Sequence, residues 1–496
     1  MLEELPLLKN QHDHCFSLLV DDTRSLIPSR KPSAGEQYRF HFDIGTCIGC
    51  KCCVVACNEQ NGNPAHINWR RVGEIEGGTY PDTQRWHVSM GCNHCLEPAC
   101  LIGCPVEAYT KDEPTGIVLH SADICIGCQY CTWNCSYGVP QFNEDRGVVG
   151  KCDMCHGRLA VGSAPACVNA CPEGAISIEL VDMLAWRVDH ATADAPGMPS
   201  SDDSISTTRI SMPGAAIPQL GRVDITRIQP EHAHLSLVFL LVLTQLSAGA
   251  FATFWLLEIM GAHLAPLAAL LPLVIGMIAL GAAPMHLGRP IHAYRAVKNW
   301  KRSWLSREVL ALSMFAGAAT AYAGALFLGL PMTSWLAAGA FGTGILGVMS
   351  SAKIYIVKAR PAWNSAHTLA DFFLTAAVLG PRILLATGST AVDAVYVLAA
   401  VATMLQAANH LLHYYSMKTS LEYELQASAG LLDGALRDPF HAHYFLLALS
   451  LVTLFFSPVS SFVVALAAEA LSRWLFFRSV VPKTVASTYL TPSGAA

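Results

Sequence analysis

Cysteine is the residue whose spacing points most directly to chemistry in this 496-residue chain, because all 18 cysteines lie at or before Cys171. Sixteen of them form four runs of four: Cys47, Cys50, Cys53 and Cys57; Cys92, Cys95, Cys100 and Cys104; Cys125, Cys128, Cys131 and Cys135; and Cys152, Cys155, Cys167 and Cys171. The first and third runs have the spacing of ferredoxin loops that bind [4Fe-4S] clusters, in which the fourth cysteine ligates a second cluster. Gly49 and Gly127 lie inside these loops, where a residue without Cβ lets backbone amides approach cluster sulfurs.

Other interpretations of the cysteines fit this spacing less well. A zinc site uses two short cysteine pairs and needs neither a third cysteine two residues further on nor a Cys-Pro after a gap of three. An even cysteine count also suits disulfides, but gaps of two residues in repeated runs favour metal chelation, and the first 40 residues have no signal-peptide pattern. We therefore expect iron–sulfur clusters in a reducing compartment. Cys15 is expected to be a structural or surface thiol, and Cys52 a packed thiol beside a cluster.

The composition predicts that a second part of the chain crosses a membrane. Hydrophobic residues make up 52% of the chain and charged residues 14%, with a mean hydropathy of +0.37. The net charge of −5 gives no indication of nucleic-acid binding. Because a helix needs about 20 mainly apolar residues to span a bilayer, we expect about eight transmembrane helices after Glu231. They are predicted at 234–257, 266–285, 308–330, 335–356, 367–386, 391–413, 442–457 and 460–479, with seven as the alternative count because 442–457 is short.

The positive charges of the short loops predict the orientation of these spans. With eight spans, the loops on the side of the cysteine segment contain nearly all the lysine and arginine, including Arg295, Lys301 and Lys358, and the opposite loops contain none. The exception is Arg382, inside the fifth span. Since positive loops stay on the cytoplasmic side, we expect a cytoplasmic (inner) membrane protein whose cluster domain faces the cytoplasm.

Residues 40–180 resemble a known family. The four runs, with Cys92-Asn-His-Cys95 and Lys151-Cys152-Asp-Met-Cys155, are similar to the four-cluster iron–sulfur subunit of dimethyl sulfoxide reductase-type molybdoenzymes and of related polysulfide, formate and nitrate-type complexes. The resemblance implies four [4Fe-4S] clusters and a separate molybdopterin catalytic subunit. It also implies a nested set of ligands, in which the four groups are Cys47, Cys50, Cys53 and Cys171; Cys57, Cys152, Cys155 and Cys167; Cys92, Cys95, Cys100 and Cys135; and Cys104, Cys125, Cys128 and Cys131.

The apolar half resembles the eight-helix quinol-handling anchor subunit of the same enzymes, through Met285-His286-Leu-Gly-Arg289-Pro and Leu-Ser-Arg-Glu308. Quinol oxidation releases two protons and two electrons, and histidine is well suited to accept a proton near neutral pH. His286, Arg289 and Glu308 are therefore the candidate quinone site. Glu469 and Arg473 are expected to form an ion pair within the last span, and Asp371 to be interfacial. No haem is expected, with His410 and His413 as the histidines to check.

Together these features predict an α+β ferredoxin-like four-cluster domain followed by an all-α polytopic membrane domain. The expected segments are an N-terminal extension (1–46), the cluster domain (47–180), a linker (181–230) with a short strand near 207–212, the quinone-interacting anchor (231–480) and a tail (481–496).

The predicted function is electron transfer between the membrane quinone pool and the catalytic subunit, either from quinol to a substrate or from a substrate such as sulfite to quinone. The chain has no recognisable substrate site of its own, so only quinone chemistry is expected on it. An ion-translocating redox subunit is the alternative, although acidic residues are sparse in the spans. Because the last cysteine run is closest in sequence to the membrane half, the first and fourth runs are expected to form the clusters nearest the quinone, with the reverse order as the alternative that the family leaves open.

Overall fold

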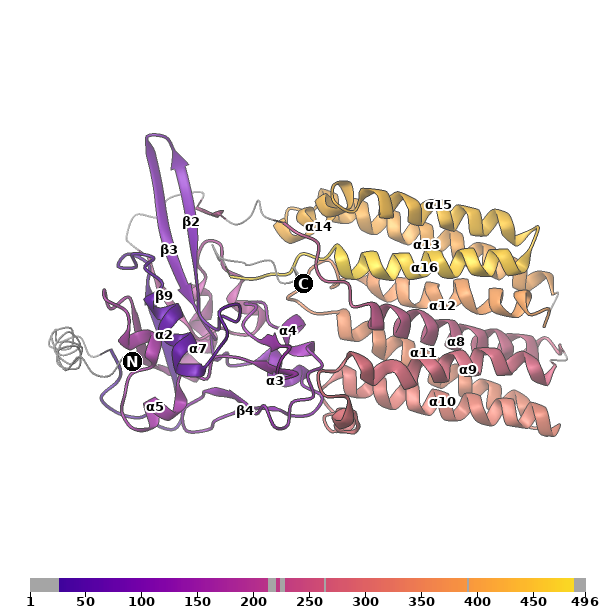
Figure 1. The fold of residues 1–496 in the computed structure, drawn as a ribbon, viewed down its shortest axis with the longest axis horizontal. Coiled ribbons are helices and arrows are strands. Elements are labelled where there is room, and N and C mark those ends of the chain that lie inside the picture. The colour runs from indigo at the N-terminus through magenta and orange to yellow at the C-terminus, as the bar shows by residue number, and fades with distance from the viewer. Residues whose placement is uncertain (1–25, 213–219, 224–227, 263–264, 390–391, 486–496) are drawn as a thin grey trace, which may run out of the picture.

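The computed structural model describes residues 26–212, 220–223, 228–262, 265–389 and 392–485. Cys15 lies outside these ranges. The chain forms a part built of small sheets and short helices, followed along the long axis of the molecule by a bundle of long helices (Figure 1).

The main sheet of the first part is built around β1 (Glu36–Asp43), which lies between β8 (Ile176–Asp182) and β9 (Arg209–Ser211). β1 runs antiparallel to β8 and parallel to β9. Arg39 is opposite Glu179 in the β1–β8 register, and an Arg39 Nη2–Glu179 Oε2 ion pair of 2.8 Å joins the two strands. Although burial raises the pKa of Glu179, the hydrogen bond and positive charge of His41 and the charge of Arg39 outweigh it and lower that pKa to about 2.

Two further strands form the long hairpin that projects from this part in Figure 1, namely β2 (Arg71–Thr79) and β3 (Asp82–Met90). The two-residue strand β10 (Gly221–Arg222) pairs with the edge of β2. The remaining strands form two small hairpins: β4 (Tyr109–Lys111) with β5 (Val118–His120), and β6 (Gln141–Asn143) with β7 (Val148–Gly150).

Short helices follow the cysteine loops because a residue in the left-handed region turns the chain into each helix. Lys51, Gln129 and Cys155 take this conformation at the N-caps of α2 (Cys52–Asn61), α4 (Tyr130–Asn134) and α5 (His156–Ala160). The other short helices are α3 (Ala99–Gly103) and α6 (Ala166–Asn169). In the first and third runs this turn separates the first two cysteines, on the loop, from the third, in the first turn of the helix.

The segment predicted as a linker contains structure that packs on the cysteine loops. The predicted short strand is confirmed as β9, and α7 (Met183–Asp189) and two 3₁₀ turns precede it. Thr207 Oγ1 donates a hydrogen bond to the carbonyl of Asn93 at 2.6 Å. Ser204 Oγ donates to Cys95 Sγ at 3.1 Å. These contacts tie the segment to the second cysteine run.

The second part is a bundle of long helices joined by tight loops. Its helices are α8 (Leu235–Ile259), α9 (Pro266–Ala282), α10 (Trp304–Leu328), α11 (Thr333–Tyr355), α12 (Ala366–Ala386), α13 (Asp393–Thr419), the short α14 (Tyr423–Asp433), α15 (Arg437–Leu454) and α16 (Pro458–Arg478). The 3₁₀ helices η4 (Ala283–His286) and η5 (Pro290–Val297) connect α9 to α10.

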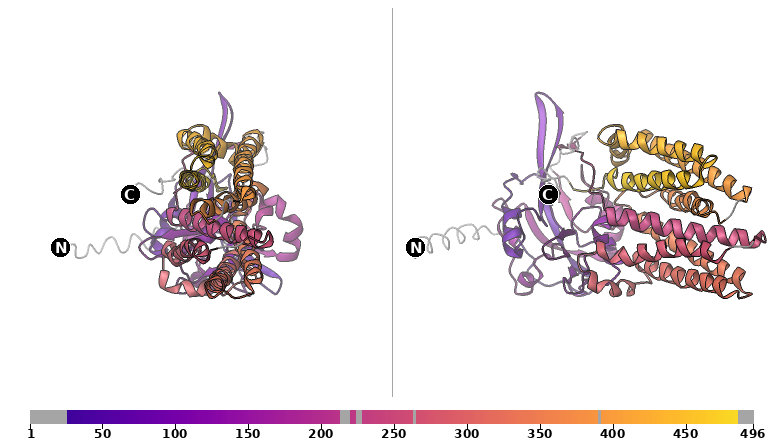
Figure 2. Two further views of the ribbon diagram at one scale, coloured as in Figure 1. Left: turned by 90° about the vertical axis from the view of Figure 1, so that its right-hand side faces the viewer. Right: turned by 45° about the vertical axis from the view of Figure 1, so that its right-hand side comes forward.

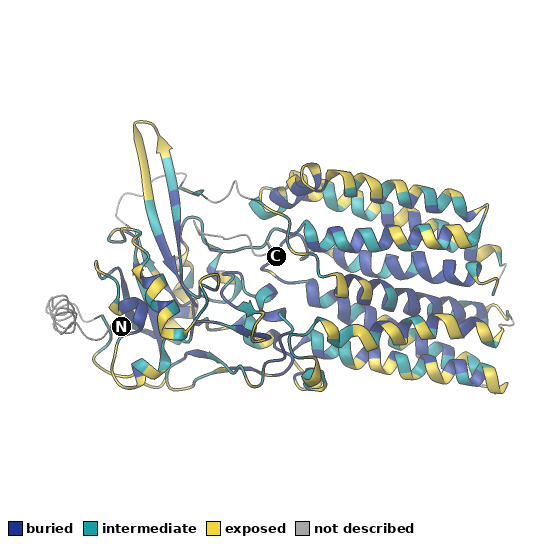
Figure 3. Cartoon of the chain, in the orientation of Figure 1, coloured by how far each residue is buried: buried dark blue, intermediate teal, exposed yellow. Residues whose placement is uncertain are grey.

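α8 and α12 lie at the centre of this bundle. α9 and α11 pack against α8, with α10 against both of them, whereas α13 and α16 pack against α12, with α15 on α16 (Figure 2). Figure 3 shows that α8 and α12 are the most buried helices. A Cβ on Gly249 of α8 would lie 2.0 Å from the carbonyl oxygen of Ala376 in α12, so the close approach of the two helices requires glycine there.

Seven of these helices are long and apolar enough to cross a membrane. They are α8, α9 extended to His286, α10, α11, α12, α13 and α16. The predicted span at 442–457 corresponds to α15, which begins at Arg437. The prediction was based on apolar residues and therefore missed the mainly polar first turns of this helix. The predicted count of eight is therefore approximate.

Candidate functional site

The first part of the structure contains two cavities that are each lined by a group of four cysteines. Cys47, Cys50, Cys53 and Cys171 line one cavity. Cys92, Cys95, Cys100 and Cys135 line another. In each group three cysteines come from one run and the fourth comes from a run elsewhere in the sequence.

The other eight cysteines fall into two more groups. We identify the members of each group as the cysteines whose negative charge raises the pKa of a neighbouring thiol. Burial, followed by the negative charges of Cys167 and Cys155, raises the pKa of Cys57 to about 12. Burial also raises the pKa of Cys152, and the charge of Cys92, from another group, contributes more to it than those of Cys57 and Cys167.

In the last group, burial together with the charges of Cys104 and Cys125 raises the pKa of Cys128 to about 12. Cys131 has Cys128, Cys104 and Cys125 as neighbours. The two cavities and these neighbours agree with the four groups that the family resemblance implies, and the assignment of the sixteen cysteines as ligands stays a prediction.

The thiols of these groups suit polynuclear clusters better than single metal ions. Within the described ranges, no three histidine, cysteine, aspartate or glutamate side chains converge on a single-ion site. A zinc site would need its sulfurs about 2.3 Å from one point. Backbone N–H groups also point at the sulfurs, as in the 3.3 Å contact from Ala108 to Cys104 and the 3.4 Å contact from Gly127 to Cys125. Such donors stabilise the negative charge of cluster sulfurs.

Two buried cations lie between groups. Arg70 is 3% exposed. Burial by itself would lower the pKa of Arg70, but the thiolates of Cys167 and Cys53, which belong to different groups, raise it above its ordinary value. Lys151 is also buried, and its Nζ atom bonds the carbonyls of Val118 and Cys152 and lies 3.9 Å from Cys92 Sγ. Arg70 therefore offsets negative charge on two neighbouring groups, and Lys151 on the group of Cys92.

The groups follow one another in a row from the far end of the first part towards the bundle. Arg70 lies between the group of Cys53 and that of Cys167, and Cys152 of the latter is close to Cys92. Tyr109 then lies close to both Cys100 and Cys131, which belong to the two groups nearest the bundle. In Figure 1, α2 lies at the far end and α3 and α4 lie beside the bundle.

The expected order of the groups was therefore wrong. The group of Cys104, Cys125, Cys128 and Cys131, from the second and third runs, is nearest the membrane half, and the first and fourth runs are remote from it. Distance along the sequence misled the prediction because the strand β8 carries the polypeptide from the fourth run back into the main sheet. Cys52 also differs from expectation, since its side chain is exposed.

The loop between Cys125 and Cys128 contacts the motif Met285–Pro290 backbone to backbone. Gly288 N donates to the carbonyl of Gly127 at 3.3 Å, and Arg289 N donates to that of Ile126 at 3.1 Å. A Cβ on Gly288 would lie 2.3 Å from the carbonyl oxygen of Gly147. Only a residue without a side chain allows this approach.

Side chains of the α9–α10 connection extend the same contact. Asn299 Nδ2 donates to the carbonyl of Cys104 at 2.8 Å, and Ser303 Oγ donates to that of Gly103 at 2.7 Å. Arg289, predicted to belong to a quinone site, uses its Nη1 atom to bond the carbonyl of Ala122 at 2.8 Å. Its guanidinium therefore holds the two parts together.

Glu308 lies near the same cysteine group, and His286 lies near His234, two residues before the Gly288 contact. Burial raises the pKa of Tyr130, and the charges of Cys128 and Glu308 raise it further, so Tyr130 is close to both. Burial, with the charges of His232, Arg360 and His286, lowers the pKa of His234 to about 4. The buried Nδ1 atom of His286 makes no hydrogen bond with the described residues. An unpaired buried nitrogen of this kind suits a polar ligand.

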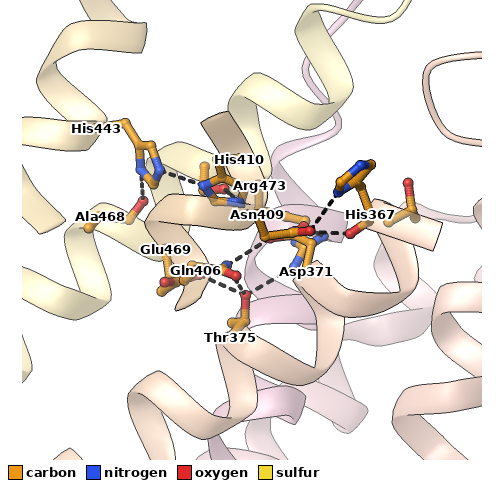
Figure 4. Close-up of polar contacts among 12 residues, drawn as sticks. His367, Asp371, Thr375, Gln406, Asn409, His410, His443, Ala468, Glu469 and Arg473 are labelled. Atoms are coloured by element: carbon orange, nitrogen blue, oxygen red, sulfur yellow. Dashed lines mark hydrogen bonds and ion pairs between the residues drawn. The ribbon is translucent and has the colours of Figure 1, made fainter. Parts of the chain in front are cut away.

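A polar network that was only partly anticipated lies in the second half of the bundle (Figure 4). Asp371 is buried, not interfacial as predicted. Arg473 forms its ion pair with Asp371, at 2.8 Å, and not with Glu469 as predicted. Glu469 instead accepts hydrogen bonds from Thr375 and Gln406. The prediction of an ion pair within α16 considered neighbours along one helix, whereas the partner came from α12.

The histidines of this network are also engaged. His410 Nε2 lies 2.7 Å from Asp371 Oδ1, and His410 Nδ1 lies 2.9 Å from His443 Nε2. In this arrangement neither ring nitrogen of His410 is available as an axial ligand to haem iron. The ring of His413 stacks on that of His367, with centroids 5.1 Å apart.

Comparison with known protein families matches both parts. Residues 84–180 match a 4Fe-4S dicluster domain, and residues 230–478 match the DMSO reductase anchor subunit (DmsC). The B polypeptide of anaerobic dimethyl sulfoxide reductase from Escherichia coli is 40% identical over 168 residues, which cover 32% of this chain and 82% of that protein.

Two relatives come from other complexes. The B polypeptide of sulfite dehydrogenase from Allochromatium vinosum is 36% identical over 155 residues, or 27% of this chain and 65% of that protein. The formate dehydrogenase iron-sulfur subunit of Haemophilus influenzae is 38% identical over 170 residues, which cover 31% of this chain and 54% of that protein.

These matches account for both parts of the structure. The first part is an electron-transfer domain that carries [4Fe-4S] clusters, and the second is a multi-pass membrane anchor. This protein belongs to the family of DMSO reductase anchor subunits and joins such an anchor, in one polypeptide, to an iron–sulfur part homologous to the B polypeptide of dimethyl sulfoxide reductase.

Proposed function

We propose that this chain relays electrons between the membrane quinone pool and a separate molybdopterin catalytic subunit through four [4Fe-4S] clusters. The observation that supports it best is the grouping of the cysteines into four sets of four, each drawn from two runs. The proposed ligands are Cys47, Cys50, Cys53 and Cys171; Cys57, Cys152, Cys155 and Cys167; Cys92, Cys95, Cys100 and Cys135; and Cys104, Cys125, Cys128 and Cys131. When bound, a [4Fe-4S] cluster takes up and releases one electron at a potential set by its surroundings.

Positively charged and hydrogen-bonding residues around the four sets stabilise the negative charge of the cysteine sulfurs. Arg70 and Lys151 offset the thiolates of adjacent sets, and Ser204 donates a hydrogen bond to Cys95. Most of the sixteen cysteines are buried or partly buried, with Cys50 exposed, and the row of sets leads from the bundle to the far end of the first part. We propose that the catalytic subunit docks at that far end.

We propose a quinone site under the set that contains Cys128. His286 would hydrogen-bond a quinone oxygen and exchange its proton through the unpaired Nδ1 atom. Glu308, which lies beside Tyr130, would carry protons onward. Arg289 is assigned to docking of the two parts, because its guanidinium is bonded to Ala122.

The chemistry of the relatives leaves two directions of electron flow. A reductase takes electrons from quinol, and a sulfite-oxidising enzyme gives them to quinone; the dimethyl sulfoxide reductase relative supports the first and the sulfite dehydrogenase relative the second.

The positive loops at 289–307 and 353–360 favour a cytoplasmic (inner) membrane location with the cluster domain facing the cytoplasm. We also propose that the chain is divided into a cluster domain at 47–180, a connecting segment and an anchor at 231–480.

Metal analysis of the purified complex tests the cluster proposal. Four clusters of four iron atoms predict about sixteen iron atoms per chain, together with molybdenum from a co-purified partner. In Cys128→Ser the signal of one cluster in electron paramagnetic resonance (EPR) spectra should change while the others remain. Iron content near half of this value, or one equivalent of zinc, would contradict the proposal.

Quinol-driven reduction of the clusters tests the site at His286. In His286→Ala the reduction rate with a naphthoquinol analogue should fall at least tenfold, while chemical reduction by dithionite is unchanged. His441→Ala is the matched control, because His441 is exposed at the same end of the bundle. An undiminished rate in His286→Ala refutes the assignment.

A further inference from the structure

The network around His410 contains a chain of three hydrogen bonds that begins and ends on an acceptor. His443 Nδ1 lies 3.0 Å from the carbonyl oxygen of Ala468, His443 Nε2 lies 2.9 Å from His410 Nδ1, and His410 Nε2 lies 2.7 Å from Asp371 Oδ1 (Figure 4). The three side chains come from α13, α15 and α12, so the chain crosses the second half of the bundle.

The number of protons in this chain follows from its geometry. Three hydrogen bonds need three protons, and neither the Ala468 carbonyl nor an ionised Asp371 carboxylate supplies one. Two neutral imidazoles supply one N–H each. This chain of hydrogen bonds therefore contains one proton more than two neutral histidines and an ionised carboxylate would supply.

The partners of Asp371 place that proton on the histidine side. Oδ2 accepts a hydrogen bond from Arg473 at 2.8 Å, and Oδ1 accepts one from Gln406 at 2.8 Å. With both oxygens acting as acceptors, the carboxylate is stabilised in its ionised form. The extra proton then makes the His410–His443 pair singly positive.

In this state Arg473, Arg382 and the protonated histidine pair are positive, and Asp371 and Glu469 are negative. The charged and titratable groups that face His410 come from α12 (Asp371, His367 and Arg382), α13 (His413 and Tyr414), α15 (His443) and α16 (Glu469 and Arg473).

Water can reach the chain from the end of the bundle that faces the cluster domain. A cavity of about 80 Å³ is lined by polar groups that include Asp371, His410 and His443, and by residues such as Met417 and Ser479 near the ends of α13 and α16. Since one water needs about 10–15 Å³ of such space, the cavity has room for several. When the proton leaves, two acceptors 2.7 Å apart would face each other, and a water from this cavity would separate them.

An aromatic wall joins the same cavity to the nearest cysteine group. Trp363 lines the cavity and lies 5.5 Å, between ring centroids, from Trp133, which stands between Cys131 and Cys135 in sequence. Phe476 stacks on Trp363 at 5.0 Å, and the Arg473 guanidinium lies 5.4 Å from the Phe476 ring. Such an apolar wall screens charges poorly, so charge on one side is felt on the other.

We propose that the Asp371–His410–His443 chain is a proton-exchange site whose occupancy is linked to the redox state of the cluster held by Cys104, Cys125, Cys128 and Cys131. When that cluster gains one electron from quinol, or from dithionite in a test, one proton enters from water at the cluster-facing end and binds at the chain. Linkage is reciprocal, so a bound proton also favours reduction of the cluster. This inference rests on the proposed cluster ligands and adds a proton site separate from His286.

EPR-monitored redox titrations of the complete complex test this, from about pH 5 to about pH 8, where histidine titrates. The signal that changes in Cys128→Ser identifies the cluster. In the wild type its midpoint potential should fall as the pH rises. A potential that does not depend on pH overturns the inference, whereas missing cluster signals would instead contradict the proposed function.

Asp371→Asn is the decisive variant because it leaves the net charge of the network unchanged. An asparagine Nδ2–H can donate to His410 Nε2, so three bonds are made with neutral imidazoles and no extra proton. The pH dependence should be lost in Asp371→Asn and in His410→Gln, and kept in the control His441→Gln. A pH dependence that persists in Asp371→Asn overturns the inference, and the wild-type titration decides even if a variant fails to assemble.

Discussion

Gly288→Ala should separate the cluster domain from the membrane anchor at their closest contact. The added Cβ would lie 2.3 Å from the carbonyl oxygen of Gly147, a backbone atom that cannot rotate away as a side chain would. Overpacking of this kind costs about 1–3 kcal/mol. Moving the loop apart would also break the bonds from Gly288 N and Arg289 N, at about 0.5–1.5 kcal/mol each.

The sum for Gly288→Ala is about 2–6 kcal/mol, which weakens local docking by roughly 30-fold or more. Hydrogen exchange measured by mass spectrometry should therefore show faster exchange at residues 122–128 and 286–303, with the main sheet unchanged. Gly281→Ala is the matched control, because a Cβ at Gly281 of α9 would meet nothing within 4 Å. Equal exchange in Gly288→Ala and the wild type would refute the docking argument.

Three further predictions concern the cluster domain. Arg70→Met removes a buried cation beside two cysteine groups, so the reduction potentials of both clusters should fall in EPR titrations, and unchanged potentials would contradict this role. Ser204→Ala removes the 3.1 Å hydrogen bond to Cys95, which should lower the reduction equilibrium constant of that cluster by roughly two- to tenfold in the same titration. The lowered pKa of Glu179 stabilises the fold above the unfolded value of 4.5, and this contribution is lost as the pH falls towards about 2. Glu179→Gln should therefore reduce the acid dependence of unfolding, measured by circular dichroism, and an identical pH profile would exclude the ion pair as its source.

Much of the candidate site could be predicted because ligand spacing is a local property. The gaps between Cys47 and Cys57 or Cys125 and Cys135 determine which thiols one loop presents, so the cofactor type follows from the sequence. The resemblance added the choice of partner runs, and the cavities and neighbouring thiols of the structure agree with the same groups. The limits of most spans were also predictable, since about 20 apolar residues suffice to identify a helix that crosses a membrane.

The order of the clusters and the partners of buried charges required the tertiary structure. β8 returns the polypeptide to the main sheet after Cys171, which places the second and third runs against the anchor and the first and fourth far from it. Asp371 and Arg473 are 102 residues apart, and nothing local to either one identifies the other. Sequence determines chemistry where the interacting groups share one loop or helix. Where an ion pair, a proton chain or a docking surface joins distant elements, only their packing decides it, because the energy of a buried charge depends on which partners the fold brings within hydrogen-bonding distance.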